Sequence, residues 1–216
     1  MKIHFRYNLE MEWDNFQRGM HSKNHSGKLF PLAQEIKDNQ LDFNDKKVVL
    51  NFIKNQTATL NLNPTEKIFK IKNDWEKIEI ESVKRTNALF NTSLNHDIMV
   101  YLTISSRCGY NIDQHYFFVN MFSKNTNLIM LHELLHFYTY QTILPMFKKQ
   151  KLNHDKFNDY KEALTFLLNT NFNDLLDGAL DNGYEKQKDL RIYLEEKWSK
   201  FGNVIDFSKF IIENYY

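Results

Sequence analysis

The fold is best judged first from residues 127–140, which read NLIMLHELLHFYTY. On a helical wheel, apolar side chains cover most of the circumference of this stretch, which is typical of a buried helix. The polar exceptions share one arc of about 120°, and they are His132, Glu133, His136, Thr139 and Tyr140. We predict a helix over residues 127–143, with Pro145 just past its end.

Two histidines and a glutamate in this helix have the spacing of a metal site. His132 and His136 are four residues apart, about one helical turn, so both imidazoles can reach one ion. Glu133 lies about 100° further round the helix, where it can take a proton from a water on that ion without binding the ion. We expect one Zn²⁺ here, with Glu133 as the general base. The alternative is a pair of core histidines, which would bury three polar groups at a high free-energy cost.

A catalytic zinc usually has three protein ligands and one water, so a third ligand is needed. The motif with a further histidine six residues on is absent, since position 142 is threonine. Glu162 is our first candidate, because a predicted helix over residues 157–169 can hold it rigidly beside the first helix. That face of the helix could instead meet water. The other candidate ligands are His154, Asp155 and Asp159.

The rest of the chain predicts a mainly helical α+β fold. Residues 98–104 and 115–120 are rich in strand-forming side chains, and a turn at residues 107–111 separates them. Six glycines and three prolines in 216 residues leave few helix breakers. We expect further helices over residues 29–39, 46–54, 64–90, 185–200 and 206–213. A short β-sheet would then be followed by the HELLH helix and a C-terminal helical bundle.

Charge and hydropathy exclude several classes of protein. The 28 Lys and Arg residues nearly balance the 27 Asp and Glu residues, so the net charge is +1 and no nucleic-acid partner is expected. Cys108 is the sole cysteine, which rules out an internal disulfide. No apolar run approaches the ~20 residues of a membrane-spanning helix, and no signal peptide is visible. We predict a cytoplasmic protein without a membrane partner.

The HELLH motif of residues 132–136, followed by Glu162 26 residues later, resembles the gluzincin group of zinc metallopeptidases. The resemblance covers residues 98–169 and implies that zinc is held by the two histidines and Glu162, with a peptide or protein as substrate. It also implies that the strand at residues 115–120 pairs with that substrate. Many gluzincins carry an acidic residue four positions after the glutamate, which supports the first histidine. Here that position is Phe166, so the support must come from Thr165, Asn169 or a backbone carbonyl.

On this resemblance we expect a single domain over residues 1–216 that hydrolyses peptide bonds. Residues 1–95 would form a helical N-terminal layer, and residues 96–216 a metallopeptidase-like core. Tyr184 is our candidate for stabilising the oxyanion of the substrate, and the other candidates are Tyr160 and His154. Two alternatives are a regulatory protease with one dedicated protein substrate and a catalytically inactive, zinc-containing protein-binding domain. The departure at residue 166 keeps the second alternative open. The oligomeric state is not predicted.

Overall fold

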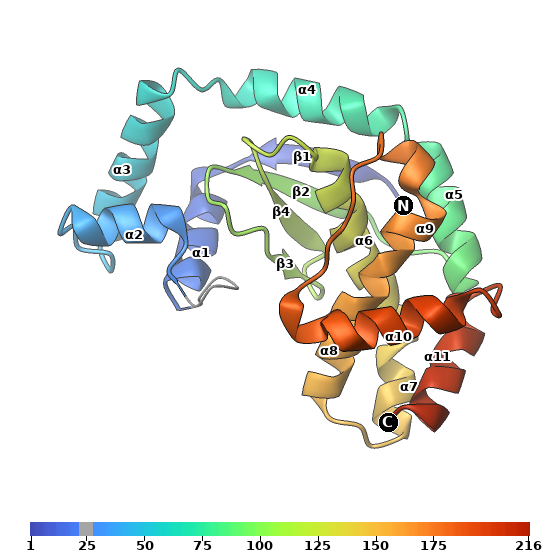
Figure 1. Cartoon of the computed structure of the whole chain (residues 1–216). Coiled ribbons are helices and arrows are strands. Elements are labelled where there is room, and N and C mark those ends of the chain that lie inside the picture. The colour runs from blue at the N-terminus through green and yellow to red at the C-terminus, as the bar shows by residue number, and fades with distance from the viewer. Residues whose placement is uncertain (22–27) are drawn as a thin grey trace. The chain divides into compact units, whose positions relative to one another are not determined.

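The computed structural model describes residues 1–21 and 28–216 (Figure 1). These residues divide into two compact units, each of which draws on separate stretches of the chain. We name them for their main content: the sheet unit is residues 2–74 and 96–126, and the helical unit is residues 75–95 and 127–216 with Met1.

This division does not follow the expected boundary at residue 95. Strand β1 (Ile3–Tyr7) lies in the expected helical layer, yet it pairs along its length with β2 (Ile98–Thr103), which comes after that boundary. Conversely, residues 75–95 belong to the same unit as the C-terminal helices. The first 95 residues are therefore not a separate helical layer.

The sheet unit is built on four strands in the order β1-β2-β4-β3. β2 runs parallel to β1 and to β4 (Tyr116–Asn120), while β3 (Tyr110–Asn111) pairs antiparallel to the start of β4. The first four residues of β4 are buried, as is usual for a strand inside a parallel sheet. β4 therefore has neighbours on both sides at Phe117 and is not an open edge there, in contrast to the role expected for residues 115–120.

β4 also begins one residue later than expected. His115 has a φ of 55°, in the left-handed region, and its amide bonds to the carbonyl of Ile112 in a tight turn. Left-handed backbone cannot continue a strand. Residues 115–120 are rich in strand-forming aromatic side chains, and this pattern does not predict the left-handed conformation of His115.

Helices α1 (Leu9–Met20), α2 (Pro31–Asp38) and α3 (Lys46–Thr59) complete most of the sheet unit. They share an apolar cluster that consists of Phe16, Leu32, Ala33, Ile36, Val49 and Ile53. α2 and α3 lie where the sequence predicts helices, whereas α1 was not predicted. Asn8 begins α1 by accepting a hydrogen bond from the amide of Glu10 at 2.8 Å.

The helix expected over residues 64–90 is two helices, α4 (Pro64–Glu76) and α5 (Glu79–Phe90). The break falls at residues 77 and 78, which are lysine and isoleucine. Neither residue breaks helices by itself, and the amide of Ile78 bonds to the carbonyl of Trp75 in a turn at this point. Helix propensity therefore does not predict the break between α4 and α5.

The helical unit contains α5, which is green in Figure 1, and the helices after the sheet, whose colours run from yellow-green to red. These are α6 (Thr126–Thr142), α7 (Leu144–Lys149), α8 (His154–Ala163), α9 (Leu167–Asn171), α10 (Lys188–Trp198) and α11 (Val204–Asn214). A 3₁₀ turn at residues 164–166 joins α8 to α9, so the helix expected over residues 157–169 is irregular in its middle. The prediction of a mainly helical α+β fold is confirmed.

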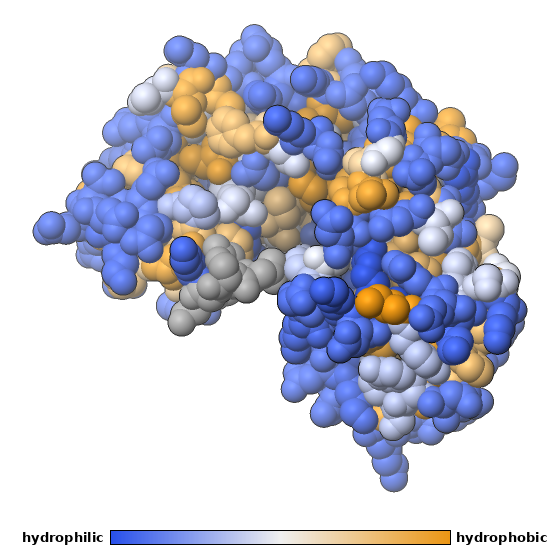
Figure 2. Space-filling view, viewed as in Figure 1, coloured by the Kyte–Doolittle hydropathy of each residue, from blue (hydrophilic) through white to orange (hydrophobic). Residues whose placement is uncertain are grey.

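Polar residues cover most of the face seen in Figure 2, and apolar residues show as scattered patches. The most exposed large apolar side chains are Ile80 on α5 and Phe69 on α4, at 84% and 66%. Among the described residues, no helix combines the length and apolar character that crossing a membrane requires.

Candidate metal centre

Helix α6 carries its histidines and glutamate on a side that is buried. His136 and Glu133 are 1% and 5% exposed, and the His132 side chain is 13% exposed. The leucines at positions 134 and 135 on the other side are also buried. The polar arc expected from the helical wheel therefore faces other protein groups and not water.

Helix α8 brings Glu162 to this arc. The Oε2 atom of Glu162 lies 3.5 Å from Nε2 of His132 and 3.4 Å from Nε2 of His136. This oxygen is buried and neither contact has the geometry of a hydrogen bond. Ligands about 2.0–2.1 Å from a tetrahedral ion are separated from one another by about 3.3–3.4 Å. The two distances are therefore compatible with a common ion between these side chains.

The group formed by His132, His136 and Glu162 can hold a metal ion. One possible ligand atom from each residue lies within 4.8 Å of the other two. Across residues 1–21 and 28–216, no second group of three or more His, Cys, Asp or Glu side chains meets the same condition. The structure thus brings together the three residues expected from the sequence.

Asp181, which the sequence analysis did not identify, supports His132. Its Oδ2 lies 2.8 Å from Nδ1 of His132. Its Oδ1 accepts hydrogen bonds from Thr165 Oγ1, Gly183 N and Arg191 Nη1, each at 3.0 Å. Because these three donors fix Oδ1 in place, Oδ2 is held toward the imidazole of His132. We infer that the ring proton is on Nδ1, which leaves the Nε2 lone pair directed at the metal position.

The support expected from Thr165 or Asn169 is therefore indirect. Thr165 donates to Asp181 Oδ1, and the Asn169 side chain exchanges two hydrogen bonds with the Asp181 backbone at 2.8 and 2.9 Å. Phe166 is fully buried and its ring packs near Trp198, because the 3₁₀ turn at residues 164–166 directs position 166 into the apolar core. An acidic side chain at position 166 would not reach the histidines by the route expected for a regular helix.

The charges around the cluster shift the pKa values of its members. Burial alone would raise the pKa of Glu162, but His136, His132 and Lys161 outweigh burial and hold it well below its usual range. Burial and then the charge of Lys161 lower the pKa of His136 to about 3. Burial also opposes the proton on His132, but Asp181 and Glu162 outweigh it and raise that pKa to about 10. Without a metal, His132 therefore holds an additional proton, which a metal ion would displace.

The other expected ligands lie outside the metal group. His154 is an exposed residue at the start of α8, with its ring 5.9 Å from that of Phe157. Asp159 accepts hydrogen bonds from Lys186 and Gln187 at 2.7 and 2.6 Å. Both residues thus have surroundings that do not involve the α6 histidines.

Tyr160, one of the candidates for stabilising an oxyanion, has a structural role in the interior of the helical unit. It is fully buried, and its hydroxyl lies 2.7 Å from that of Ser208. Tyr184 is half-buried just before a 3₁₀ turn at residues 185–187, three residues after Asp181. Its role toward a substrate stays a prediction.

No family model, curated protein or solved structure matches this chain. The likeness to gluzincins therefore rests on the motif residues and their spacing. Together, fold and site define a mainly helical α+β protein with a candidate metal centre between α6 and α8.

Proposed function

We propose that the chain is a zinc-dependent peptidase in which His132, His136 and Glu162 bind Zn²⁺. The spacing of Glu162 Oε2 from the two Nε2 atoms, 3.5 and 3.4 Å, is the observation that carries the proposal. Two imidazole nitrogens and one carboxylate oxygen form a ligand set that suits zinc, whereas Ca²⁺ and Mg²⁺ prefer oxygen ligands throughout. Three protein ligands leave a tetrahedral ion one position for water or substrate.

Glu133 is the proposed general base. It follows His132 directly and is buried beside the cluster, and its negative charge contributes to the raised pKa of His132. Zinc would supply Lewis acidity toward a water and the scissile carbonyl. Glu133 accepts the proton of the attacking water and returns it to the departing amine. Asp181 keeps His132 in the tautomer that this arrangement needs.

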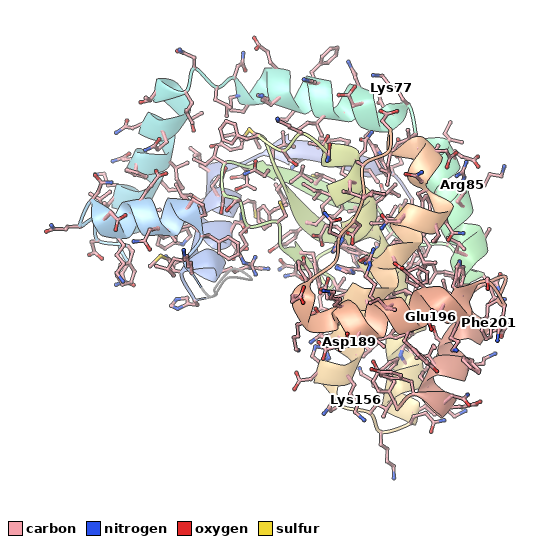
Figure 3. All side chains as sticks on the ribbon, in the orientation of Figure 1. Lys77, Arg85, Lys156, Asp189, Glu196 and Phe201 are labelled. Carbon is pink, nitrogen blue, oxygen red and sulfur yellow. The ribbon has the colours of Figure 1, made fainter. Side chains whose placement is uncertain are left out.

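A Glu133→Gln variant tests the mechanism. We expect it to retain one zinc per chain by elemental analysis, because Glu133 is not a ligand, while the turnover of peptide substrates falls by roughly 10²–10⁴-fold. Glu196→Gln on α10 is the matched control, since Glu196 is an exposed glutamate labelled in Figure 3. Undiminished hydrolysis by the Glu133 variant would refute its role as base.

The choice of substrates separates this proposal from its alternatives. Cleavage of a mixed peptide library by the wild type supports a general peptidase. Cleavage of a single partner protein in a cell extract, with no library activity, supports a dedicated regulatory protease. Bound zinc with no cleavage in either assay supports an inactive binding domain.

A further inference from the structure

Lys161 places a buried positive charge at the candidate metal centre. Its side chain is 2% exposed, and its ammonium pairs with Oε1 of the neighbouring Glu162. The other carboxylate oxygen, Oε2, faces both α6 imidazoles. Burying an ammonium is costly even when it is paired with a carboxylate. We therefore ask what the charge of Lys161 does at the metal centre.

We propose that Lys161 is a positioning residue that limits Glu162 to one-oxygen metal binding and weakens the hold of the site on a divalent cation. The proposal deepens the metal-centre proposal above and rests on it. It assigns to Lys161 a role opposite in sign to that of Asp181, which strengthens metal binding.

The first part follows from the two oxygens of Glu162. A carboxylate can bind an ion through one oxygen or both. Lys161 occupies Oε1, and Oε2 alone faces Nε2 of His132 and Nε2 of His136. The ion would then have three protein ligand atoms. A second carboxylate oxygen would take the position that a water or a substrate carbonyl needs.

The second part follows from charge. An ammonium one carboxylate away from a divalent cation repels it, and the repulsion is strong because few water molecules screen the buried side chain. Residues that support a metal ligand normally strengthen metal binding, and their loss costs about 10–100-fold in affinity. Removal of Lys161 should do the reverse.

Three substitutions separate charge from hydrogen bonding. Lys161→Met removes both the charge and the donor, while Lys161→Gln removes the charge and keeps an N–H donor. Lys161→Arg retains the charge. The matched control is Lys156→Met on the same helix, where the ammonium lies 5.3 Å from the ring centroid of Tyr216 (Figure 3).

The test is a competition titration of zinc between each full-length variant and a chromophoric chelator. We expect Lys161→Met and Lys161→Gln to bind zinc about tenfold more tightly than the wild type. Lys161→Arg and Lys156→Met should stay within about twofold of it. X-ray absorption at the zinc edge should show Glu162 bound through both carboxylate oxygens in Lys161→Met and through one in Lys161→Gln.

The outcomes distinguish this inference from the proposed function. Equal or weaker zinc binding by both uncharged variants overturns the role of Lys161 while leaving the zinc site in place, as does equal tightening in Lys161→Arg. A wild type that binds no zinc overturns both proposals. Tighter binding in the uncharged variants, together with a wild type that cleaves no peptide, upholds the inference and refutes the peptidase. Since Lys161→Gln and Lys161→Met bear on charge independently, the failure of one to fold leaves the other as the test.

Discussion

Each unit of the molecule buries carboxylates, and the two units treat them differently. In the sheet unit, Glu12 is 1% exposed and accepts hydrogen bonds from Thr103 Oγ1 and the amide of Ile104 at 2.6 and 2.8 Å. Burial outweighs these neutral donors and raises its pKa to about 7. In the helical unit, Glu162 and Asp181 are also largely buried, yet both pKa values are lowered.

The difference teaches that neighbouring cations decide which buried carboxylate keeps its charge. The cations are Lys161 and His132 beside Glu162, and Arg191 and His132 beside Asp181. A cation within a few ångströms stabilises the ionised form, whereas a hydroxyl or an amide does so less. The helical unit therefore presents ionised carboxylates, which metal binding requires, while Glu12 ties α1 to the end of β2.

The largest expected effect comes from placing a carboxylate in the helical unit without such cations. Phe166→Asp would put an acid in the apolar core beside Trp198 and Phe207. We expect a loss of more than about 4 kcal/mol in the free energy of unfolding, because no partner offsets the buried charge. Urea denaturation followed by circular dichroism measures it.

The control for this substitution is Phe166→Leu, which keeps position 166 apolar and should lose about 1–2 kcal/mol. A Phe166→Asp protein that stays folded and binds zinc as tightly as the wild type would contradict the packing of this position. It would also restore the support for His132 that the sequence pattern led us to seek there.

A smaller effect is expected from Glu12, and it depends on pH. Its folded pKa is raised from 4.5 to about 7, so between these values the folded state binds more protons than the unfolded state. Glu12 therefore stabilises the folded state fully at pH values below its pKa in the unfolded chain. This stabilisation is lost as the pH rises through its pKa in the folded protein. The wild type should lose about 2–3 kcal/mol over that window, and Glu12→Gln should lack this loss.

The comparison requires urea unfolding at several pH values, with a chelator present to keep the helical unit free of metal. The difference between wild type and Glu12→Gln isolates Glu12 from histidines that titrate in the same range. Parallel pH profiles for the two proteins would show that neighbouring charges hold Glu12 ionised, as they do Glu162.

The smallest expected effect is on zinc affinity when Asp181 loses its charge. Asp181→Asn weakens the hold on the His132 ring, and we expect zinc affinity to fall by about 10–100-fold, or about 1.4–2.7 kcal/mol. Asp174→Asn is the control. Asp174 accepts hydrogen bonds from Arg85 of α5 at 2.6 and 2.8 Å, and it is not a member of the metal group. Unchanged affinity in Asp181→Asn would mean that packing alone orients His132.

The sequence predicts the parts of the molecule that depend on periodic patterns. The expected helix at residues 127–143 differs from α6 by one residue at each end, because its apolar pattern is continuous. Glu162 meets the two histidines as the resemblance to gluzincins implied, because it lies on a helix beside α6.

Other parts of the structure depend on contacts between residues far apart in the sequence, which no local pattern predicts. Asp181 lies in a loop 49 residues after His132, and its place follows from Thr165, Asn169 and Arg191, which come from separate elements. The sequence signal that precedes it is weak: Asp-Asn-Gly at residues 181–183 indicates a turn and nothing more. The pairing of β1 with β2 joins residues about 95 positions apart, which local propensity cannot reveal.

X-ray absorption at the zinc edge of the wild type, combined with zinc content per chain, tests the central claim most directly. We expect one zinc per chain, bound by two imidazole nitrogens and at least one oxygen at about 2.0–2.1 Å. We also expect the zinc to be lost when His136 is changed to alanine. A protein that takes up no zinc, or a zinc shell without imidazole nitrogen, would contradict the claim that His132, His136 and Glu162 form a metal centre.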